Sequence, residues 1–283
     1  DEKRVKAVNT VFKKMYDDGL IYRGYRVINW SVKGQSTCSD DELVYVDRKA
    51  KLYTFKYSKD CPFAIATTRP ETKLGDTAMA VNPDDERYKK YIGQTFEAKG
   101  FGGTVDLKLK VIAEDEVDME FGTGSLGVTP AHSAIDFGMY EKRKGTDDEI
   151  DLIEVIGQDG KITSKIDGYE GVDALEAREK VVNWLKENNL LEKEEEIDQN
   201  VGTSDRFGDV IESIPMTQWF VAVNKEIPGR KKTLRELVKD AVDTGHNDDP
   251  KQKINLIPES QFKRHEQRIE DLYDWCVSRQ IWW

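Results

Sequence analysis

One group of residues that could do chemistry follows the short apolar segment 63–66. It consists of Thr67, Thr68, Arg69, Pro70, Glu71 and Thr72. Proline fixes its own φ and keeps the preceding residue extended, so the strand must end with hydroxyls, a guanidinium and backbone N–H groups close together. Such a group can hold a hydroxylated ligand or a water molecule. The same residues also suit an ordinary strand-to-turn exit with capping threonines, which spacing alone favours.

A second group begins with a glycine turn made by Phe121, Gly122, Thr123 and Gly124. The two glycines allow the backbone to approach a ligand closely. The turn lacks the third glycine of a dinucleotide-binding fingerprint, and no Gly-Lys-Ser/Thr follows as in a P-loop. The turn therefore predicts close approach of the backbone and neither of these nucleotide motifs.

The same segment continues through Thr129-Pro-Ala-His132 into a predicted helix. Ser133 and Asp136 have the spacing of a capping box, with Asp in place of Glu or Gln. Asp136 is therefore either a helix cap or a carboxylate that binds the ammonium group of a ligand, and spacing leaves both open. A lone histidine such as His132 is more often packed or hydrogen-bonded than catalytic.

The cysteines and histidines do not have the spacing of a metal site. They stand far apart, at Cys38, Cys61, Cys276, His132, His246 and His265. Three cysteines cannot form a disulfide framework, so we expect a reducing, cytoplasmic compartment. We expect no metal and no cofactor.

Composition narrows the class of protein further. The 283 residues are 38% hydrophobic and 34% charged, and 43 Lys and Arg against 54 Asp and Glu give a net charge of −11. The apolar residues suffice for a core, but no apolar run approaches the ~20 residues that span a bilayer. The N-terminal residues 1–4 lack the apolar core of a signal peptide. The acidic balance argues against sequence-independent nucleic-acid binding, although a local basic face is compatible with it.

Many short strands with a few helices predict a mixed α/β (α+β) fold. Two strands, 43–45 and 52–57, are expected to pair around the charged stretch 47–51. The charged run 193–196 is expected to end a helix. Apolar spacing predicts helices near residues 3–18, 133–144, 174–188, 233–242 and 261–275.

The two chemical segments together resemble the editing domain of class I aminoacyl-tRNA synthetases, an insertion in their catalytic Rossmann fold. Residues 66–72, 74–78 and 81–88 are similar to the valine-specific members. Glu71 stands where leucine-specific members typically have Asp and isoleucine-specific members have Trp. The turn at Gly122 and the segment from Thr129 to Asp136 fit the same family. Segments 19–30, 204–220 and 274–283 resemble the stretches that flank the insertion.

The resemblance implies three parts. Residues 1–57 are expected to form an N-terminal connecting arm of helix and strands, and 58–200 a β-barrel-like editing domain with surrounding helices. Residues 201–283 are expected to form a return arm with helices leading to the catalytic domain. The His-Ile-Gly-His and Lys-Met-Ser-Lys-Ser signatures of the ATP site are absent, so we expect no aminoacylation by this piece of a longer synthetase. Ser31 and Gly34 replace the cysteines of a zinc knuckle found in many members, which again predicts no zinc.

The activity implied is post-transfer editing, the hydrolysis of threonine wrongly esterified to valine tRNA. A hydrophobic pocket rejects the added hydroxyl of threonine only about 10²-fold, so a second pocket that requires this hydroxyl is needed. The resemblance assigns Asp136 to the α-ammonium group and Thr72 to the threonine side chain. Thr67, Thr68 and Arg69 are candidates to position the terminal adenosine or the water. The resemblance also carries over as binding residues Glu71, Phe121, Gly122, Thr123, Gly124, Thr129 and His132.

Two departures concern the pocket, because Gly127 stands where valine-specific members commonly have Lys, and Ser133 where they have Asp. They predict a lost basic contact and lower efficiency. No general base is evident, so an oriented water assisted by a tRNA hydroxyl is expected. The expected partners are tRNA(Val) with its mischarged 3′ end and the rest of the synthetase, with no membrane and a monomeric state. Editing of isoleucyl or leucyl type, a non-catalytic tRNA-binding module and a structural insertion remain alternatives.

Overall fold

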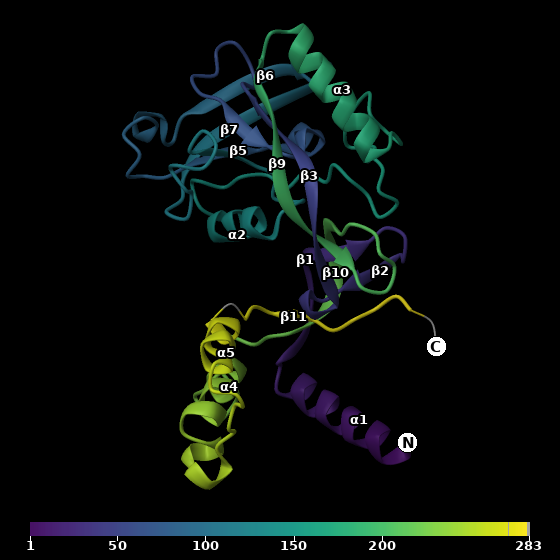
Figure 1. The fold of residues 1–283 in the computed structure, drawn as a ribbon, viewed down its shortest axis with the longest axis vertical. Coiled ribbons are helices and arrows are strands. Elements are labelled where there is room, and N and C mark those ends of the chain that lie inside the picture. The colour runs from purple at the N-terminus through teal and green to yellow at the C-terminus, as the bar shows by residue number, and fades with distance from the viewer. Residues whose placement is uncertain (271, 282–283) are drawn as a thin grey trace. The chain divides into compact units, whose positions relative to one another are not determined.

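The computed structural model of the chain describes residues 1–270 and 272–281 (Figure 1). In chain order the helices and strands are α1 (Glu2–Asp17), β1 (Ile21–Ser31), β2 (Ser36–Cys38), β3 (Leu43–Phe55), β4 (Ile65–Thr67), β5 (Ala78–Val81), β6 (Thr95–Phe101), β7 (Val105–Ala113), β8 (Ser125–Val128), α2 (Ala134–Arg143), α3 (Ala174–Glu187), β9 (Leu191–Ser204), β10 (Glu212–Val221), α4 (Leu234–Asp243), α5 (Gln261–Glu270) and β11 (Trp275–Cys276). A 3₁₀ helix, η2 (Pro70–Gly75), follows β4. The mixed α/β class is confirmed.

The chain divides into two compact units. One contains residues 1–25 and 217–279, and the other contains residues 26–216 with the chain from Gln280 onward. Every residue that the sequence marks for catalysis or binding lies in the second unit. The division into arms at 1–57 and 201–283 around a domain at 58–200 stays a prediction.

Three open sheets organise the strands, in the orders β11-β10-β1-β2, β4-β3-β9 and β6-β7-β5-β8. Strands β5 and β7 are parallel, with Ala78 opposite Lys110, while β5 and β8 are antiparallel. The described residues form no closed barrel, so the barrel-like expectation was wrong. The reason is that the strands of this region fall into two separate sheets, β4-β3-β9 and β6-β7-β5-β8, instead of one sheet whose two edges pair.

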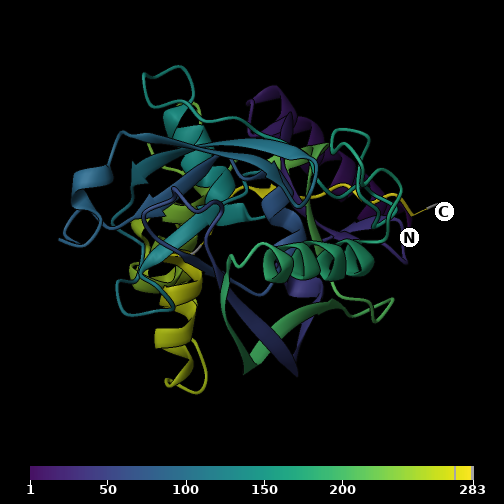
Figure 2. The ribbon, with the colours of Figure 1, turned by 90° about the horizontal axis from the view of Figure 1, so that it is seen from above.

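Strand β3 is a single strand of 13 residues, paired with β9 from Leu43 opposite Ser204 to Phe55 opposite Leu191. The expected hairpin within residues 43–57 and the expected helix end at 193–196 were therefore wrong. Charges that discouraged a strand assignment are paired across the ribbon, for example Lys51 with Glu194 at 2.6 Å. The two-stranded ribbon of β3 and β9 is seen in Figure 2 as the dark blue and green strands.

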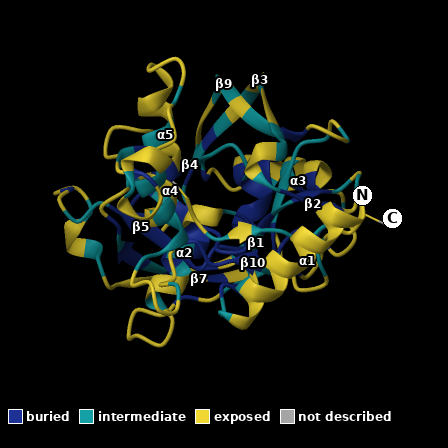
Figure 3. Cartoon of the chain, turned by 90° about the horizontal axis from the view of Figure 1, so that it is seen from below, coloured by how far each residue is buried: buried dark blue, intermediate teal, exposed yellow. Residues whose placement is uncertain are grey.

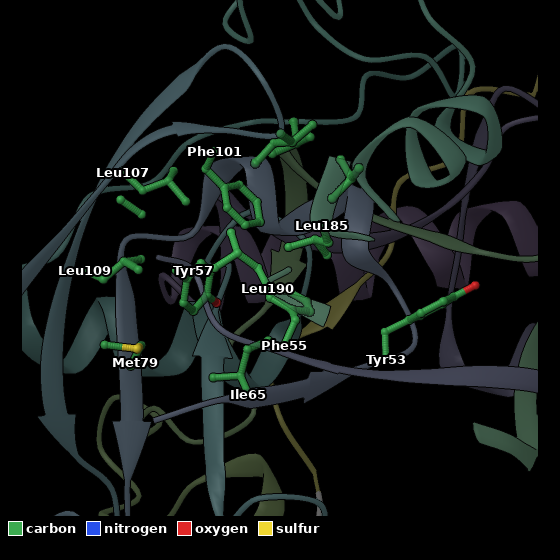
Figure 4. Close-up of a cluster of buried hydrophobic side chains, with 14 of the residues drawn as sticks. Tyr53, Phe55, Tyr57, Ile65, Met79, Phe101, Leu107, Leu109, Leu185 and Leu190 are labelled. Carbon is green, nitrogen blue, oxygen red and sulfur yellow. The ribbon is translucent and has the colours of Figure 1, made fainter. Parts of the chain in front are cut away.

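The core of the second unit is built from aromatic and aliphatic side chains of β3, β5, β6, β7 and α3 (Figure 4). The rings of Phe55 and Tyr57 lie 5.9 and 5.4 Å from the ring of Phe101. Leu74 of η2 is fully buried in the same core. A buried side chain of this kind contributes about 1.5–3 kcal/mol, so the core fixes η2 and the residues it carries.

Helix α1 of the first unit has no buried residue, and Figure 3 shows it in the exposed colour. Helix α4 begins with the capping box that the sequence predicts, because the Thr233 N–H donates to Glu236 at 2.7 Å and the Glu236 N–H donates to the Thr233 hydroxyl at 3.1 Å. None of the helices in the described part of the chain is long and apolar enough to cross a membrane.

Candidate functional site

The glycine turn of the second chemical segment lies against β4, the strand that leads into the first segment. The Ser125 hydroxyl at the start of β8 donates to the Ala64 carbonyl at 2.7 Å. Gly122 has φ +59°, and a Cβ atom there would lie 3.0 Å from Cβ of Ala66. The glycine turn therefore packs against Ala66 of β4, and the expected close approach of its backbone to a ligand stays a prediction.

Asp136 lies in the first turn of α2 and is 5% exposed. Its Oδ2 accepts from the Thr129 N–H at 2.8 Å, and its Oδ1 accepts from the Ser133 hydroxyl at 3.0 Å. The Ser133 hydroxyl also accepts from the Asp136 N–H at 3.2 Å and so caps the helix. Ser133 is thus the cap, whereas the Asp136 carboxylate binds the Ser133 hydroxyl and the Thr129 N–H in place of the Ser133 N–H of a full capping box. These bonds leave the carboxylate able to accept more, because each of its oxygens has a second acceptor position. The helix N-terminus also favours a negative charge.

Behind Thr129 lies a buried polar network, which we call the Lys73 network: Tyr57, Lys73, Asp76 and Thr129. Lys73 is 5% exposed, and its ammonium donates to Asp76 Oδ1 at 3.2 Å, to the Gly127 carbonyl at 2.8 Å and to Thr129 Oγ1 at 2.8 Å. The hydroxyls of Tyr57 and Thr129 both donate to Asp76. Burial raises the pKa of Asp76 against the opposing charge of Lys73, and burial with the Asp76 charge raises the pKa of Tyr57 well above its ordinary value.

Gly127 lies against the Lys73 network. A Cβ atom at this position would overlap the Tyr57 hydroxyl and Asp76 Oδ2. The position therefore accepts no larger residue unless the network moves. The ammonium group beside the Gly127 carbonyl comes from Lys73 of η2.

A second ionic network surrounds Glu71, whose side chain is fully buried. Arg178 of α3 donates to both of its carboxylate oxygens, from Nε and Nη2, at 2.7 Å each. Arg69 reaches Glu71 at 3.3 Å and also pairs with Glu212. Burial alone would raise the pKa of Glu71, but the hydrogen bonds and charges of Arg178 and Arg69 outweigh it and lower this pKa. Arg69 and Glu71 thus have ionic partners within the protein.

A cavity of about 300 Å³ borders this ionic network. Glu71, Arg178 and Glu212 contribute to its wall, together with Asp159, Asp173 and Asp209. Because carboxylates outnumber the cations in this wall, the cavity repels phosphate groups and is a poor candidate for holding a tRNA end.

The three threonines of the first segment all hydrogen-bond locally or across the ribbon. Thr72 is buried and donates to the Arg69 carbonyl at 2.9 Å. Thr67 accepts from the Arg69 N–H at 3.0 Å, and Thr68 accepts from Gln199 at 3.2 Å. These bonds fit a strand exit with capping threonines, and the predicted catalytic roles of Thr67, Thr68 and Thr72 remain predictions.

The two predicted binding residues of the glycine turn that carry side chains differ in exposure. Phe121 is 65% exposed, so its ring is open to solvent. The hydroxyl of Thr123 hydrogen-bonds to Ser125 Oγ at 2.9 Å, and Tyr88 donates to the Thr123 carbonyl at 2.6 Å. Thr123 therefore stabilises the turn, whereas Phe121 is available to a ligand.

His132 is buried, and both ring nitrogens are engaged. Nε2 accepts from the N–H groups of Val155 and Ile156 at 2.8 and 3.1 Å, so Nδ1 carries the proton and donates to the Ser213 carbonyl at 2.8 Å. Burial, assisted by the charge of Arg69, lowers the pKa of His132 to about 4. The interpretation as a packed, hydrogen-bonded histidine is confirmed.

This environment predicts a pH-dependent stability. The unfolded chain protonates His132 below its ordinary pKa of 6.5, while the folded chain does so only near 4. The free energy of unfolding is therefore expected to fall by up to about 3 kcal/mol as pH drops from 6.5 to 4 because of this residue. Urea denaturation of the unsubstituted chain and of His132→Gln across this range measures the difference. The exposed His246→Gln serves as control, and equal pH slopes for His132→Gln and the unsubstituted chain would contradict the assignment.

The positions expected to lack a zinc knuckle are held by hydrogen bonds. The Ser31 hydroxyl donates to Asp209 at 2.7 Å, and the Gly34 N–H donates to Ser31 Oγ at 2.9 Å. A Cβ atom at Gly34 would overlap the ring of Phe207. Residues 1–270 and 272–281 contain no group of three or more His, Cys, Asp or Glu side chains placed to hold a metal ion.

Comparison with known families decides which proteins this chain is related to. The family model of class I tRNA synthetases for isoleucine, leucine, methionine and valine matches residues 1–283. The chain belongs to this family. The synthetase chain is 41% identical to the valine–tRNA ligase of Clostridium acetobutylicum, 42% to that of Staphylococcus carnosus and 38% to that of Halalkalibacterium halodurans.

Each alignment covers the whole synthetase chain but only 30% of the relative. The chain is therefore similar throughout to one part of valine–tRNA ligases, enzymes of protein biosynthesis. The resemblance read from its motifs is confirmed at the level of the family.

Sequence reasoning assigned no role in the site to Tyr57, Lys73, Asp76 or Arg178 of the synthetase chain. A buried Glu71 requires a cation, but nothing in the sequence of α3 distinguishes Arg178 from the exposed charges around it. The run Leu74-Gly-Asp-Thr-Ala78 did mark Asp76 as part of the family pattern. Its partners come from β3, β8 and the segments beside them, which only folding brings together.

Proposed function

We propose that this synthetase chain hydrolyses threonine wrongly esterified to valine tRNA. The observation that carries the proposal is the Asp136 carboxylate, held by the Thr129 N–H and the Ser133 hydroxyl at the start of α2. A substrate α-ammonium group fits its remaining acceptor positions, since an ionised carboxylate accepts several hydrogen bonds. The glycine turn packed against β4 and the exposed Phe121 support a site that takes a bulky ester.

The chemistry proposed relies on an oriented water. The water oxygen attacks the ester carbonyl carbon, the bond from this carbon to the ribose oxygen breaks, and a water proton passes to the ribose oxygen. His132 is not the base, because its Nε2 already accepts two backbone hydrogen bonds and its Nδ1 is a donor. An adjacent hydroxyl of the tRNA is the group proposed to assist the proton transfer.

The direct test compares hydrolysis of Thr-tRNA(Val) and Val-tRNA(Val) by this chain. We expect hydrolysis of the threonyl ester and at least tenfold slower hydrolysis of the valyl ester, because valine leaves the hydroxyl-binding groups unpaired. Threonyl esters on isoleucine and leucine tRNAs test the alternative editing types. Binding of tRNA without hydrolysis of any ester would leave a non-catalytic tRNA-binding module as the function.

We also expect weak tRNA binding by this chain that falls steeply with salt. The net charge of −11 opposes a polyanion, and two cations at the end of α2 are already paired, because Lys142 and Arg143 both contact Glu114. A few phosphate contacts remain for exposed groups such as Lys144 at the end of α2, and Arg230 and Lys231. Each contact adds about −0.7 to −0.9 to the slope of log affinity against log salt.

Titration of labelled tRNA at low and moderate salt checks the expected binding. Strong binding that does not change with salt would contradict it, since contacts other than phosphate pairing would then dominate.

A further inference from the structure

We propose that Lys73 is a positioning residue for the substrate-binding carboxylate of Asp136. The proposal rests on the proposed function, because it assigns to Lys73 the task of holding the group that binds the α-ammonium. Lys73 itself lies on η2, far in sequence from Asp136, and acts through Thr129.

The first step of the argument is the restraint on Thr129. Its Oγ1 accepts from the Lys73 ammonium at 2.8 Å and donates to Asp76. The Lys73 ammonium also binds the Gly127 carbonyl at 2.8 Å, two residues before Thr129. Three bonds thus fix the backbone from Gly127 to Thr129. The N–H of Thr129 is the donor to Asp136 Oδ2 at 2.8 Å, so the same restraint orients the Asp136 carboxylate.

The second step is the charge. Asp76 and Asp136 are both buried, at 1% and 5% exposure, and the Asp136 charge contributes to raising the pKa of Asp76. Lys73 is the cation that the described side chains place in contact with Asp76, at 3.2 Å. Its positive charge offsets the repulsion between the two carboxylates.

The third step concerns which element of the chain can supply the ammonium group beside the Gly127 carbonyl. Any side chain at Gly127 would overlap the hydrogen bond between Tyr57 and Asp76. The ammonium therefore has to come from another element, and η2 supplies it, because buried Leu74 anchors η2 in the core beside Lys73. The ammonium of Lys73 thus provides, beside the Gly127 carbonyl, the basic group that is absent from position 127 itself.

The test uses Lys73→Met and the double variant Lys73→Met/Asp76→Asn. The double variant removes the carboxylate that Lys73→Met leaves without its cation, and so keeps a folded protein available. Lys110→Met is the matched control, because Lys110 also binds a carboxylate, Asp148 at 2.8 Å, and a carbonyl, but outside the site. Thermal unfolding of each variant establishes that it is folded.

Two substrates separate positioning from a general structural effect: threonyl-tRNA(Val) and the same tRNA esterified with 3-hydroxybutyrate, which lacks only the α-amino group. The preference for the threonyl ester over the 3-hydroxybutyryl ester is measured as the ratio of their kcat/KM values. We expect this preference to fall at least tenfold in the folded Lys73 variants, with most of the loss in KM for the threonyl ester. Lys110→Met should keep the preference of the unsubstituted chain. An unchanged preference in the folded Lys73 variants would overturn the proposal.

If the unsubstituted chain hydrolyses neither ester, that outcome rejects only the proposed function. A measurement without substrate then tests the positioning role of Lys73. Hydrogen exchange of the Thr129 amide, followed by NMR, reports its bond to Asp136. We expect exchange at least tenfold faster in the Lys73→Met/Asp76→Asn variant and unchanged in Lys110→Met. Unaltered protection of this amide would overturn the positioning role.

Discussion

Asp136→Ala is expected to reduce hydrolysis of Thr-tRNA(Val) by about 10²–10³-fold or more while the chain stays folded. The carboxylate is 5% exposed, and two hydrogen bonds fix it at the start of α2. Without it the α-ammonium group of the substrate would enter the site with no opposite charge, which costs several kcal/mol. Single-turnover deacylation with saturating protein measures the loss.

The Asp136 side chain also accepts from the hydroxyl of Ser133, the N-cap of α2, so the variants must separate ligand binding from this structural role. Asp136→Asn keeps an oxygen for the Thr129 N–H but removes the charge, and it should be nearly as inactive as Asp136→Ala. Asp173→Ala is the control for capping alone, because Asp173 caps α3 through the Leu175 N–H at 2.9 Å. It should cost about 1 kcal/mol of stability and leave deacylation unchanged. Full activity in folded Asp136→Ala would reject the assignment, and unfolding would show that capping dominates.

Arg178→Met is expected to lower the free energy of unfolding by about 3–5 kcal/mol. The substitution removes both hydrogen bonds that Arg178 donates to fully buried Glu71. Among the described side chains, Arg69, at 3.3 Å, is the cation that then remains beside that carboxylate. A buried charge that loses its partner costs more than the pair is worth, because its desolvation is no longer compensated. Urea denaturation at neutral pH measures the loss.

Two variants and one change of pH sharpen this prediction. Lys180→Met removes an exposed pair with Glu176 on the same helix and should cost less than about 1 kcal/mol. Glu71→Leu/Arg178→Met removes both charges and should recover most of the loss. The pKa of Glu71 is lowered in the folded chain, so its ionic contribution is present above the unfolded pKa and disappears as pH falls below it. The difference between Arg178→Met and the unsubstituted chain should therefore shrink in acid, and a constant difference would contradict the ionic explanation.

Features determined by neighbouring residues could be read from the sequence alone. The cap formed by Ser133 and Asp136 and the capping box of Thr233 and Glu236 each join residues three apart, so their spacing predicts the bonds that the structure contains. The glycine turn at Gly122 and the family membership were predictable for the same reason, since both are carried by short runs of residues. The mixed α/β class followed from the alternation of apolar patterns along the chain.

Tertiary structure decided which of these residues have partners far away in sequence. Residues 43–55 form one strand because residues 191–204 supply opposite charges across the ribbon, and local charge density had predicted a break. Glu71 received its main cation from a residue 107 positions later, and His132 became a neutral hydrogen-bonded residue through backbone groups 23, 24 and 81 positions away. Spacing along the chain carries no information about such pairs, because loop closure allows many partners and the packed core selects one.

At the candidate site, Lys73 and Gly127 show the same difference between what the sequence determines and what the tertiary structure decides. The sequence by itself determined that position 127 has no side chain and that a lysine follows Thr72. Only the fold places that lysine against the Gly127 carbonyl and Thr129, because buried Leu74 holds η2 in the core while Tyr57 and Asp76 fill the space beside Gly127. The physical reason is that an ammonium group is located by the packing of the element that carries it, whereas the sequence specifies only its order along the chain.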